Sequence, residues 1–475
     1  MARINTNVAS LTAQRGLSKS QRTLNETLQR LSSGLRINRG ADDPAGLIAS
    51  ENLRSEMAGI SQAIDNSSRA SNVIATAEGA LSEVAALLLN IKDLIVEAAN
   101  SGAMSPAEIE ANQLQIDSAV DSITRISNTT TFAGLKLIDG SLGYITSGVD
   151  QSIVRALNLH QVNFGTQDTF PVKIDVVASA KTASLEFRAS AITNSVTLEI
   201  AGNEGVETLS FTSGTAASAI AFAVNRISDA TGVKASLINP SAPTSGIVFN
   251  SVGYGSKSYV SVRAQSGSFN VVDESGATVQ RAVGTDVTAT VNGALTVGDG
   301  RTLKLNTTSL DMELTLDESF GTGQTEFTIT GGGAMFQLGP KVTSNQQVNI
   351  AIQSVAASKL GDDEVGFLNE IVTGGPYSLV AGGAGAASRI VEKAIQQVAV
   401  LRGRLGAFER NTLETNRNSL TIALENVTAS ESTIRDADFA KETSALTRAQ
   451  ILTQAGTSVL ATANTTPQSV LSLLG

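Results

Sequence analysis

Three long stretches of this chain contain no proline, and each repeats apolar residues at helical spacing. The stretches are residues 1–43, 45–105 and 377–466. A proline inside a helix costs about 3 kcal/mol, so these gaps fit uninterrupted helices. In the second stretch the apolar positions alternate four and three residues apart, at Ala77, Leu81, Val84, Leu88 and Ile91. This spacing predicts a coiled-coil seam on a helix over residues 45–99, which would be roughly 80 Å long.

Local signals predict where these helices begin and end. Asp43 can cap a helix that starts at the following proline, and Gly40 lets the preceding chain turn. We therefore expect one helix to end near Arg36 and another to begin near residue 44. Ser105 and Glu108 form a second start signal, of the capping-box kind. The helix that follows is expected to return antiparallel to the one before it.

The middle of the chain changes to the period-two pattern that is typical of β-strands. Runs such as VTLEI at 196–200 and MELTL at 312–316 alternate apolar and polar residues, and Gly, Ser, Thr and Asn separate them. We expect an inserted β-rich domain over residues 166–333, with one helix near 215–229. Helical spacing returns after a glycine-rich connection at 372–388.

Composition excludes several classes of function. The chain has 475 residues, a net charge of -10 and no cysteine, so a dominant nucleic-acid role, thiolate metal sites and cysteine nucleophiles are not expected. The lone histidine, His160, is expected to be a surface or interface residue rather than a catalytic one. Asp42 and Asp43 are expected to start a helix and not to act as paired acids. We therefore predict no enzyme activity and no cofactor.

The two ends of the chain are the parts least able to form stable helices on their own. Residues 1–36 and 435–475 are amphipathic but poor in large apolar groups, so alone in water they would form marginal helices. They need a partner, and the simplest partner is the same segment of another copy. Head-to-tail contacts of this kind do not close and generate a helical filament. The residues expected at this self-assembly interface are Ile4, Val8, Leu11, Leu17, Leu24, Leu28, Leu31, Leu35, Arg36, Leu446, Leu452, Val459, Leu460, Val470, Leu473 and Leu474.

An intramolecular core predicts the same apolar stripes as a contact between copies. For residues 53–98 we expect mainly intramolecular packing. For the two chain ends we favour contacts between copies.

Several sequence blocks near the two ends are distinctive. The N-terminal part contains RINTNVASL, RLSSGLRINRGADDPAGLIASENLRSE, EGALSEV and TTFAGLKLIDG. The C-terminal part contains LRGRLGAFERN at 401–411, SESTIRDADFAKE at 430–442 and the final QSVLSLLG. These blocks, in this order, resemble bacterial flagellin, the subunit of the flagellar filament.

Two further segments resemble parts of the same family. FQLGPKVTSNQQVNIAIQSV at 336–355 is similar to the β-hairpin that flagellins place on their rod. AIAFAVNRISDATGVKAS at 219–236 is similar to a motif named for its Ile-Asn core, with Val224 in place of the Ile.

The residues and the resemblance together predict an α + β multidomain fold. Its expected parts are a long antiparallel α-helical coiled-coil rod built from both chain ends, a small β-hairpin and an inserted β-rich outer domain. The expected divisions are an N-terminal core helix (1–43), N-terminal rod helices (44–165), a variable outer insert (166–333), a hairpin with the C-terminal rod helix (334–434) and a C-terminal core helix (435–475).

The resemblance implies a structural subunit that self-assembles into the extracellular filament used for swimming motility. It also implies secretion through the flagellar type III apparatus in an unfolded state. The N-terminal residues lack the apolar core of a cleavable signal peptide, so export by another route is expected. The implied partners are an export chaperone, a filament cap and hook-associated proteins, without nucleic acid or membrane insertion. A hook-filament junction protein is an alternative, because it shares the terminal helices. A second alternative is a filament subunit whose outer insert also binds glycans.

Members of the family often engage an animal Toll-like receptor through the rod near residues 88–98. Leu94 matches a contact position of the family. Asn90 stands where strongly recognised members have Arg, and Gln115 stands where they have Glu. Because each charged hydrogen bond contributes about 1.5 to 3 kcal/mol, their loss predicts weak recognition.

Overall fold

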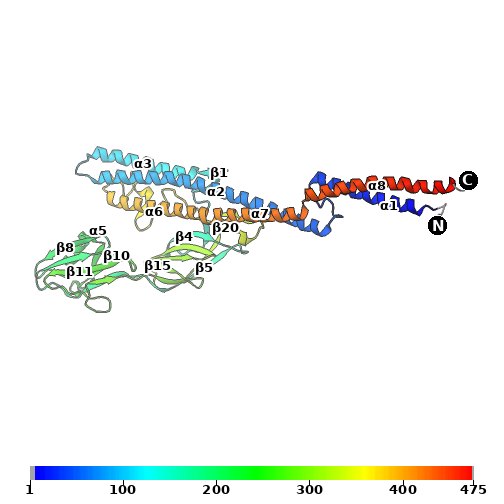
Figure 1. The fold of residues 1–475 in the computed structure, drawn as a ribbon. Helices are drawn as coiled ribbons and strands as arrows, with labels where there is room; N and C mark the ends of the chain where they lie inside the picture. Colours follow the sequence, from blue (N-terminus) through cyan, green and yellow to red (C-terminus); the bar gives the residue numbers. More distant parts are fainter. Residues whose placement is uncertain (1–5, 473–475) are drawn as a thin grey trace. The chain divides into compact units, whose positions relative to one another are not determined.

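The structure is a computed structural model that describes residues 6–472 (Figure 1). Its helices are α1 (Val8–Ser33), α2 (Pro44–Ala99), α3 (Pro106–Thr129), α4 (Ala217–Arg226), α5 (Ser228–Thr231), α6 (Ala384–Phe408), α7 (Thr415–Arg435) and α8 (Phe439–Ser472), with a π-helical turn at Glu409–Glu414. Short 3-10 turns lie at Pro243–Ser245, Ser344–Gln346 and Leu368–Glu370.

The strands lie between the helical parts of the chain. They are β1 (Thr131–Phe132), β2 (Leu135–Lys136), β3 (Tyr144–Ser147), β4 (Val154–Val162), β5 (Phe170–Ala178), β6 (Thr182–Phe187), β7 (Val196–Ala201), β8 (Val206–Phe211), β9 (Val233–Leu237), β10 (Ile247–Tyr254), β11 (Tyr259–Ser266), β12 (Arg281–Val283), β13 (Thr288–Val291), β14 (Ala294–Leu295), β15 (Val297–Asp299), β16 (Thr302–Asn306), β17 (Leu310–Leu316), β18 (Gly323–Gly332), β19 (Ala334–Gln337), β20 (Gln347–Ile350), β21 (Gly361–Asp362) and β22 (Gly366–Phe367).

The chain divides into two compact units. The first contains α1, α7, α8, residues 337–342 and α2 up to Ala70. Here α7 runs antiparallel to α2, because Arg435 Nη1 donates to Glu51 Oε1 at 2.7 Å while Asn416 Nδ2 donates to Ser67 Oγ at 3.3 Å. The second unit contains the rest of α2, α3, α6 and the strand-rich middle of the chain.

Buried side chains on the long helices follow the spacing seen in the sequence. Those of α2 recur at alternating steps of three and four residues: Ile60, Ala63, Ser67, Ala70, Ile74, Ala77, Leu81, Val84, Leu88, Ile91, Ile95 and Ala98. Helix α3 buries Ile116, Val120 and Ile123, and α6 buries Ile390, Ala394 and Val398. Burial of the stripe over 53–98 within the chain agrees with the expected intramolecular packing.

Helix boundaries confirm two of the expected caps and define how the first helix ends. The backbone N–H of Gly46 donates to Asp43 Oδ1 at 2.9 Å, so Asp43 caps α2, and Ser105 and Glu108 form a complete capping box. The first helix was expected to end near Arg36, and it ends at Ser33 with Gly34 as its C-cap, while Gly40 lies in the turn before α2. Gly34 has the left-handed φ of 73°, and its N–H donates to Arg30 O at 2.8 Å, which closes the last turn of α1.

Two β modules occupy the middle of the chain. The first, here called the carrier module, contains the sheets β14-β13-β5-β18-β3 and β15-β16-β17-β4. Its pairs include Leu314 opposite Leu157 and Phe327 opposite Val172. Both sheets contribute to one buried cluster, which contains Ile174, Leu303 and other aliphatic residues. The alternation of apolar and polar residues along each strand produces this one-sided burial.

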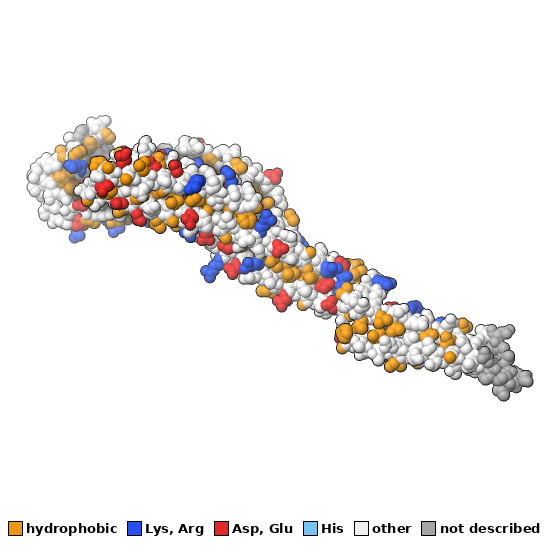
Figure 2. Space-filling view, turned by 90° about the horizontal axis from the view of Figure 1, so that it is seen from above, with side chains coloured by type: hydrophobic (Ala, Val, Ile, Leu, Met, Phe, Trp, Pro, Cys, Tyr) orange, Lys and Arg blue, Asp and Glu red, His pale blue; other side chains and the backbone are white. Residues whose placement is uncertain are grey.

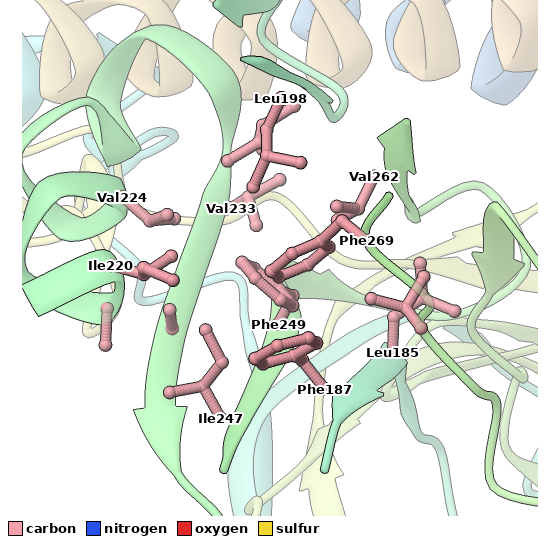
Figure 3. Close-up of a cluster of buried hydrophobic side chains, with 14 of the residues drawn as sticks. Leu185, Phe187, Leu198, Ile220, Val224, Val233, Ile247, Phe249, Val262 and Phe269 are labelled. Carbon is pink, nitrogen blue, oxygen red and sulfur yellow. The ribbon is translucent and has the colours of Figure 1, made fainter. Parts of the chain in front are cut away.

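The second module, here called the nested module, lies in sequence between β5 and β13. It contains the sheets β12-β11-β7-β8 and β6-β10-β9 and the helix α4. Figure 3 shows side chains of these elements converging on one core, in which Phe249 lies among Leu198, Val233 and Phe269. The Phe187 and Phe269 rings stack with centroids 4.0 Å apart. The helix expected near 215–229 is present as α4 and α5.

The β region begins earlier than expected. Strands β3 and β4 lie inside the range 44–165 that was expected to form rod helices. Strand β4 pairs with β17, and β3 pairs with β18, so both belong to the carrier module. Their partners are more than 100 residues away in sequence, and local spacing carries no signal for such pairing.

Candidate assembly surface

Helices α1 and α8 lie side by side and run antiparallel. Asn7 Nδ2 donates to Ala463 O at 2.7 Å near the chain ends, and Arg30 Nη1 lies 3.4 Å from Glu442 Oε1 at the other end of the pair. Asn7 also caps α1, since its side chain accepts from the Ser10 N–H at 3.0 Å.

The contact between α1 and α8 combines small and polar side chains with partly buried leucines. Within residues 6–33 and 439–466 the buried residues are Thr27, Glu442 and Ala449. Leu17 lies directly against Gly456, where an added Cβ would come within 3.3 Å of Leu17 Cδ1. This contact line on α8 repeats every seven residues, at Glu442, Ala449, Gly456 and Ala463. We did not recognise it in the sequence, although the heptad spacing of small residues was a usable signal.

Large apolar side chains on both helices face away from this contact line. They include Val8, Leu11 and Leu28 of α1, and Ile451, Leu452 and Val459 of α8. Leu28 is 45% exposed and Ile451 is 63% exposed. Figure 2 shows apolar side chains on the visible face of this terminal helix pair. Soluble chains rarely expose such a series of large aliphatic groups on adjacent helices without a partner that covers them.

The residues expected at the interface separate into two sets. Leu17, Leu24, Leu31, Leu446 and Leu460 are partly buried at the heptad positions that face the partner helix, whereas Val8, Leu11, Leu28, Leu452 and Val459 are exposed. Ile4, Leu473 and Leu474 lie outside the described residues, as does the Val470 side chain. Ile451, which was not on the expected list, belongs to the exposed set.

The other two expected residues, Leu35 and Arg36, lie in a clasp between the two helix ends. Leu35 forms an antiparallel bridge with Asp436, and the Arg36 N–H donates to Arg435 O at 2.7 Å. The Arg36 guanidinium donates to Ile434 O of the same chain. In addition, Asp42 accepts from the backbone N–H groups of Arg39 and Asn38, which lowers the pKa of its carboxyl. Asp42 therefore acts as a turn residue, and Asp43 acts as the cap of α2.

The three residues expected on a receptor-facing surface do not all reach the surface. Asn90 and Gln115 are exposed, but Leu94 is buried, with 8% of its surface exposed. Leu94 is three residues from Ile91 and four from Ala98, both of which are buried, so it extends the buried stripe of α2.

His160 is half-buried on β4 and not a freely solvated residue. Its Nε2 atom is buried and has no hydrogen-bond partner among residues 6–472. Burial, and secondarily the positive charge of Arg404, lowers the pKa of His160 to about 3. Within the described part of the chain, no group of three or more His, Cys, Asp or Glu side chains is placed to hold a metal ion. None of the described helices carries a stretch apolar enough to cross a bilayer.

Family comparisons match both ends of the chain and part of its middle. The bacterial flagellin N-terminal helical region matches residues 4–142, and the bacterial flagellin C-terminal helical region matches residues 388–474. The flagellin hook IN motif matches residues 197–253, which include α4 and α5.

Similar proteins match over nearly the whole length. A B-type flagellin of Pseudomonas aeruginosa and a flagellin B of Vibrio cholerae are each 30% identical, over 99% of this chain and 99% of the relative. Among solved structures, flagellar hook-associated protein-3 of Legionella pneumophila aligns over 81% of this chain and 98% of its own, with 13% identity and a TM-score of 0.32. The D2-D3 domains of the flagellar cap protein of Escherichia coli align over 40% of this chain and 100% of their own, with 20% identity and a TM-score of 0.29.

Proposed function

This chain belongs to the bacterial flagellin family and is a structural subunit of the extracellular flagellar filament, and we propose that it polymerises through the apolar side chains that α1 and α8 leave exposed. The family self-polymerises and serves swimming motility. No catalytic family is indicated.

One observation carries the proposal: among the described residues of the α1–α8 pair only Thr27, Glu442 and Ala449 are fully buried, while six large aliphatic side chains stay exposed, namely Val8, Leu11, Leu28, Ile451, Leu452 and Val459. Burying a whole Leu or Ile side chain contributes about 1.5 to 3 kcal/mol, so covering the exposed half of one contributes about 1 kcal/mol. Each copy exposes several such side chains, so burying them together stabilises the contact between successive copies along a polymer. A second copy exposes the same apolar side chains, so a contact between two copies covers the exposed faces of both.

We further propose that α2, α3, α6 and α7 form an antiparallel coiled-coil rod. The step of three and four residues between buried positions of α2 supports this packing. Strands β19 and β20, which form a two-stranded sheet, are proposed as the hairpin on that rod. The proposed divisions remain 1–43, 44–165, 166–333, 334–434 and 435–475, with β3 and β4 transferred to the insert.

The proposed partners are an export chaperone, a filament cap and hook-associated proteins, with secretion through the type III apparatus. Terminal helices with so little buried apolar surface unfold at small cost, which suits passage through a narrow channel and refolding on docking. Recognition by a Toll-like receptor is proposed to be weak, because Asn90 and Gln115 present uncharged side chains. Strong activation of receptor reporter cells by purified monomer would contradict that.

The experiment is a comparison of two double variants of the full chain. Leu28→Gln with Leu452→Gln changes the exposed face of α1 and α8, whereas Leu295→Gln with Val297→Gln changes two residues of the carrier module that are even more exposed. We expect the first variant to remain a folded monomer that fails to extend filament seeds at the wild-type critical concentration. The second should polymerise like the wild type. Seeded growth of the first variant at the wild-type concentration would overturn the proposal.

A further inference from the structure

A small acidic hairpin, residues 361–367 with the sequence GDDEVGF, is attached to one face of helix α6. Strands β21 and β22 pair Gly361 with Phe367 and Asp362 with Gly366. The Gln397 side-chain amide holds the Gly361 backbone twice, by accepting from its N–H at 2.8 Å and donating to its carbonyl at 2.8 Å. Lys393, one helical turn before Gln397, places its Nζ 2.9 Å from Asp362 Oδ2.

The hairpin can take this tight form only with glycine at its two corners. Gly361 has φ of 113° and Gly366 has φ of 104°. A Cβ on Gly361 would lie 2.2 Å from Gly366 O, and one on Gly366 would lie 2.7 Å from Glu370 Oε2. Asp362 is also held from within the turn, because it accepts from the N–H groups of Glu364 and Val365. Burial tends to raise the pKa of Asp362, but Lys393 and these N–H groups outweigh it and keep the pKa below its ordinary value.

The tip of the hairpin points its remaining two acids at the carrier module. Asp363 Oδ2 lies 3.5 Å from Arg155 Nε of β4, and Arg155 Nη2 donates to the Asp363 carbonyl at 3.4 Å. Glu364 accepts from Arg301, which lies between β15 and β16. Three consecutive acids therefore pair with cations from α6, from β4 and from the β15–β16 turn.

Arg301 is more than a surface cation. Its side chain is 13% exposed, its Nη1 donates to Leu316 O at 3.4 Å, and its guanidinium lies 4.8 Å from the centroid of the Tyr254 ring. Tyr254 ends β10 of the nested module, and its hydroxyl donates to Glu318 at 3.3 Å. Arg301 thus connects the hairpin with both β modules.

A second line of contact joins the carrier module to the segment that precedes the hairpin. The Ala351 N–H donates to His160 O at 2.9 Å, and Gln353 Nε2 donates to Asn158 Oδ1 at 3.2 Å. Both bonds lie along β4, so alone they would act as an axis about which the module can turn. The Asp363–Arg155 pair is also made by a residue of β4, so the attachment point away from that axis is the Glu364–Arg301 pair.

We propose that the hairpin 361–367 is an electrostatic bracket that fixes the angle between helix α6 and the carrier module. Its attachment to α6 includes two neutral amide bonds, whereas its attachment to the module consists of the Asp363–Arg155 and Glu364–Arg301 pairs. Removing those two pairs frees the module to turn about β4 while the hairpin stays on α6.

The test measures the distance between α6 and the carrier module in the full chain. The sequence contains no cysteine, so Val400→Cys on α6 and Val297→Cys on β15 give two specific spin-label sites, which are 47% and 69% exposed. Pulsed electron paramagnetic resonance should give one narrow distance distribution for this labelled parent. Adding Asp363→Asn and Glu364→Gln, whose side chains are exposed, should broaden the distribution and shift its mean. Adding Arg155→Gln and Arg301→Gln should have the same effect.

The matched control removes two cations that do not touch the hairpin. Lys257 and Lys304 both pair with Asp299, so Lys257→Gln with Lys304→Gln should leave the distribution narrow. The proposal is overturned if the Asp363→Asn, Glu364→Gln variant keeps the parent distribution. It is equally overturned if the lysine control broadens as much as the bracket variants do.

Discussion

His160 is the residue whose chemistry the fold changes most. It lies on β4 and has Arg404 of α6 as a charged neighbour, and the charge of Arg404 also acts on Asp311 of β17. Burial first, and the Arg404 charge second, lower the pKa of His160 to about 3, while burial raises the pKa of Asp311. In the unfolded chain a histidine titrates near about 6.5. Between about pH 6.5 and 3 the unfolded state therefore binds a proton that the folded state does not bind, and stability falls as the pH falls.

The His160→Gln variant tests this pH dependence. The free energy of unfolding, measured by urea denaturation, should decrease less for the variant than for the wild type between about pH 7 and 4.5, because Gln has no proton to gain. Carboxylates titrate in both proteins, so the difference between the two profiles isolates the histidine. Parallel profiles would show that the environment of His160 leaves its pKa unchanged.

Single residues were the hardest features to predict from the sequence. The sequence placed the end of the first helix near Arg36 but did not identify Gly34 as its C-cap, a role that depends on the left-handed backbone conformation with φ of 73°. Leu94 matched a surface position of the family, yet it lies one turn from Ile91 and Ala98 on the buried stripe. The sequence states which residues are apolar, but how wide the buried stripe is depends on how closely the neighbouring helices approach.

Among the elements, helix starts were predictable because their signals are local. Asp43 and the pair of Ser105 and Glu108 act within four residues of their targets, and all three make the expected bonds. Strands such as β7, β16 and β17 follow from period-two alternation. The membership of β4 in the carrier module was not predictable, because it depends on pairing with the distant β17.

The capping box of α3 allows a quantitative prediction. Ser105 Oγ accepts from the Glu108 N–H at 3.3 Å, and Glu108 Oε2 accepts from the Ser105 N–H at 2.7 Å. Ser105→Ala should lower the free energy of unfolding by about 0.5–2 kcal/mol, the usual cost of losing such a cap. Urea denaturation at neutral pH measures it. Ser101→Ala, in the preceding exposed loop, is the control, and an equal loss in both variants would contradict a capping role.

At the scale of the whole molecule, the burial of aliphatic side chains differs between the parts of the chain, and this difference relates the structure to assembly. The α2 stripe and the two β modules bury Leu, Ile and Val side chains within the chain. In the described parts of α1 and α8 only small and polar side chains are fully buried, some leucines are partly buried, and other aliphatic side chains are exposed. The sequence predicted amphipathic ends that need a partner. It did not reveal that each helix has one heptad line of residues that packs on the other helix and a separate set of aliphatic side chains that stay exposed.

Because α1 and α8 pack on each other, we expect the folding of each helix to depend on the presence of the other. Deleting residues 1–30 removes the Arg30 partner of Glu442, the Leu17 partner of Gly456 and almost all of the helix against which Ala449 is buried. An isolated helix with the composition of α8 is marginal in water, so it should unfold when α1 is absent. The same holds for α1 when residues 446–475 are deleted. Each truncated chain should therefore stay soluble and fail to polymerise.

Far-ultraviolet circular dichroism gives the sharper measurement of this dependence. Each single deletion should lose as much helical signal as the double deletion of 1–30 and 446–475, because the surviving helix loses its partner in both cases. Sedimentation after seeding should find no polymer in any of the three. If the single deletions instead lose only their own share of helix, the two ends fold independently and the pairing argument fails. If either single deletion grows long filaments, the aliphatic faces of α1 and α8 are not both required for assembly.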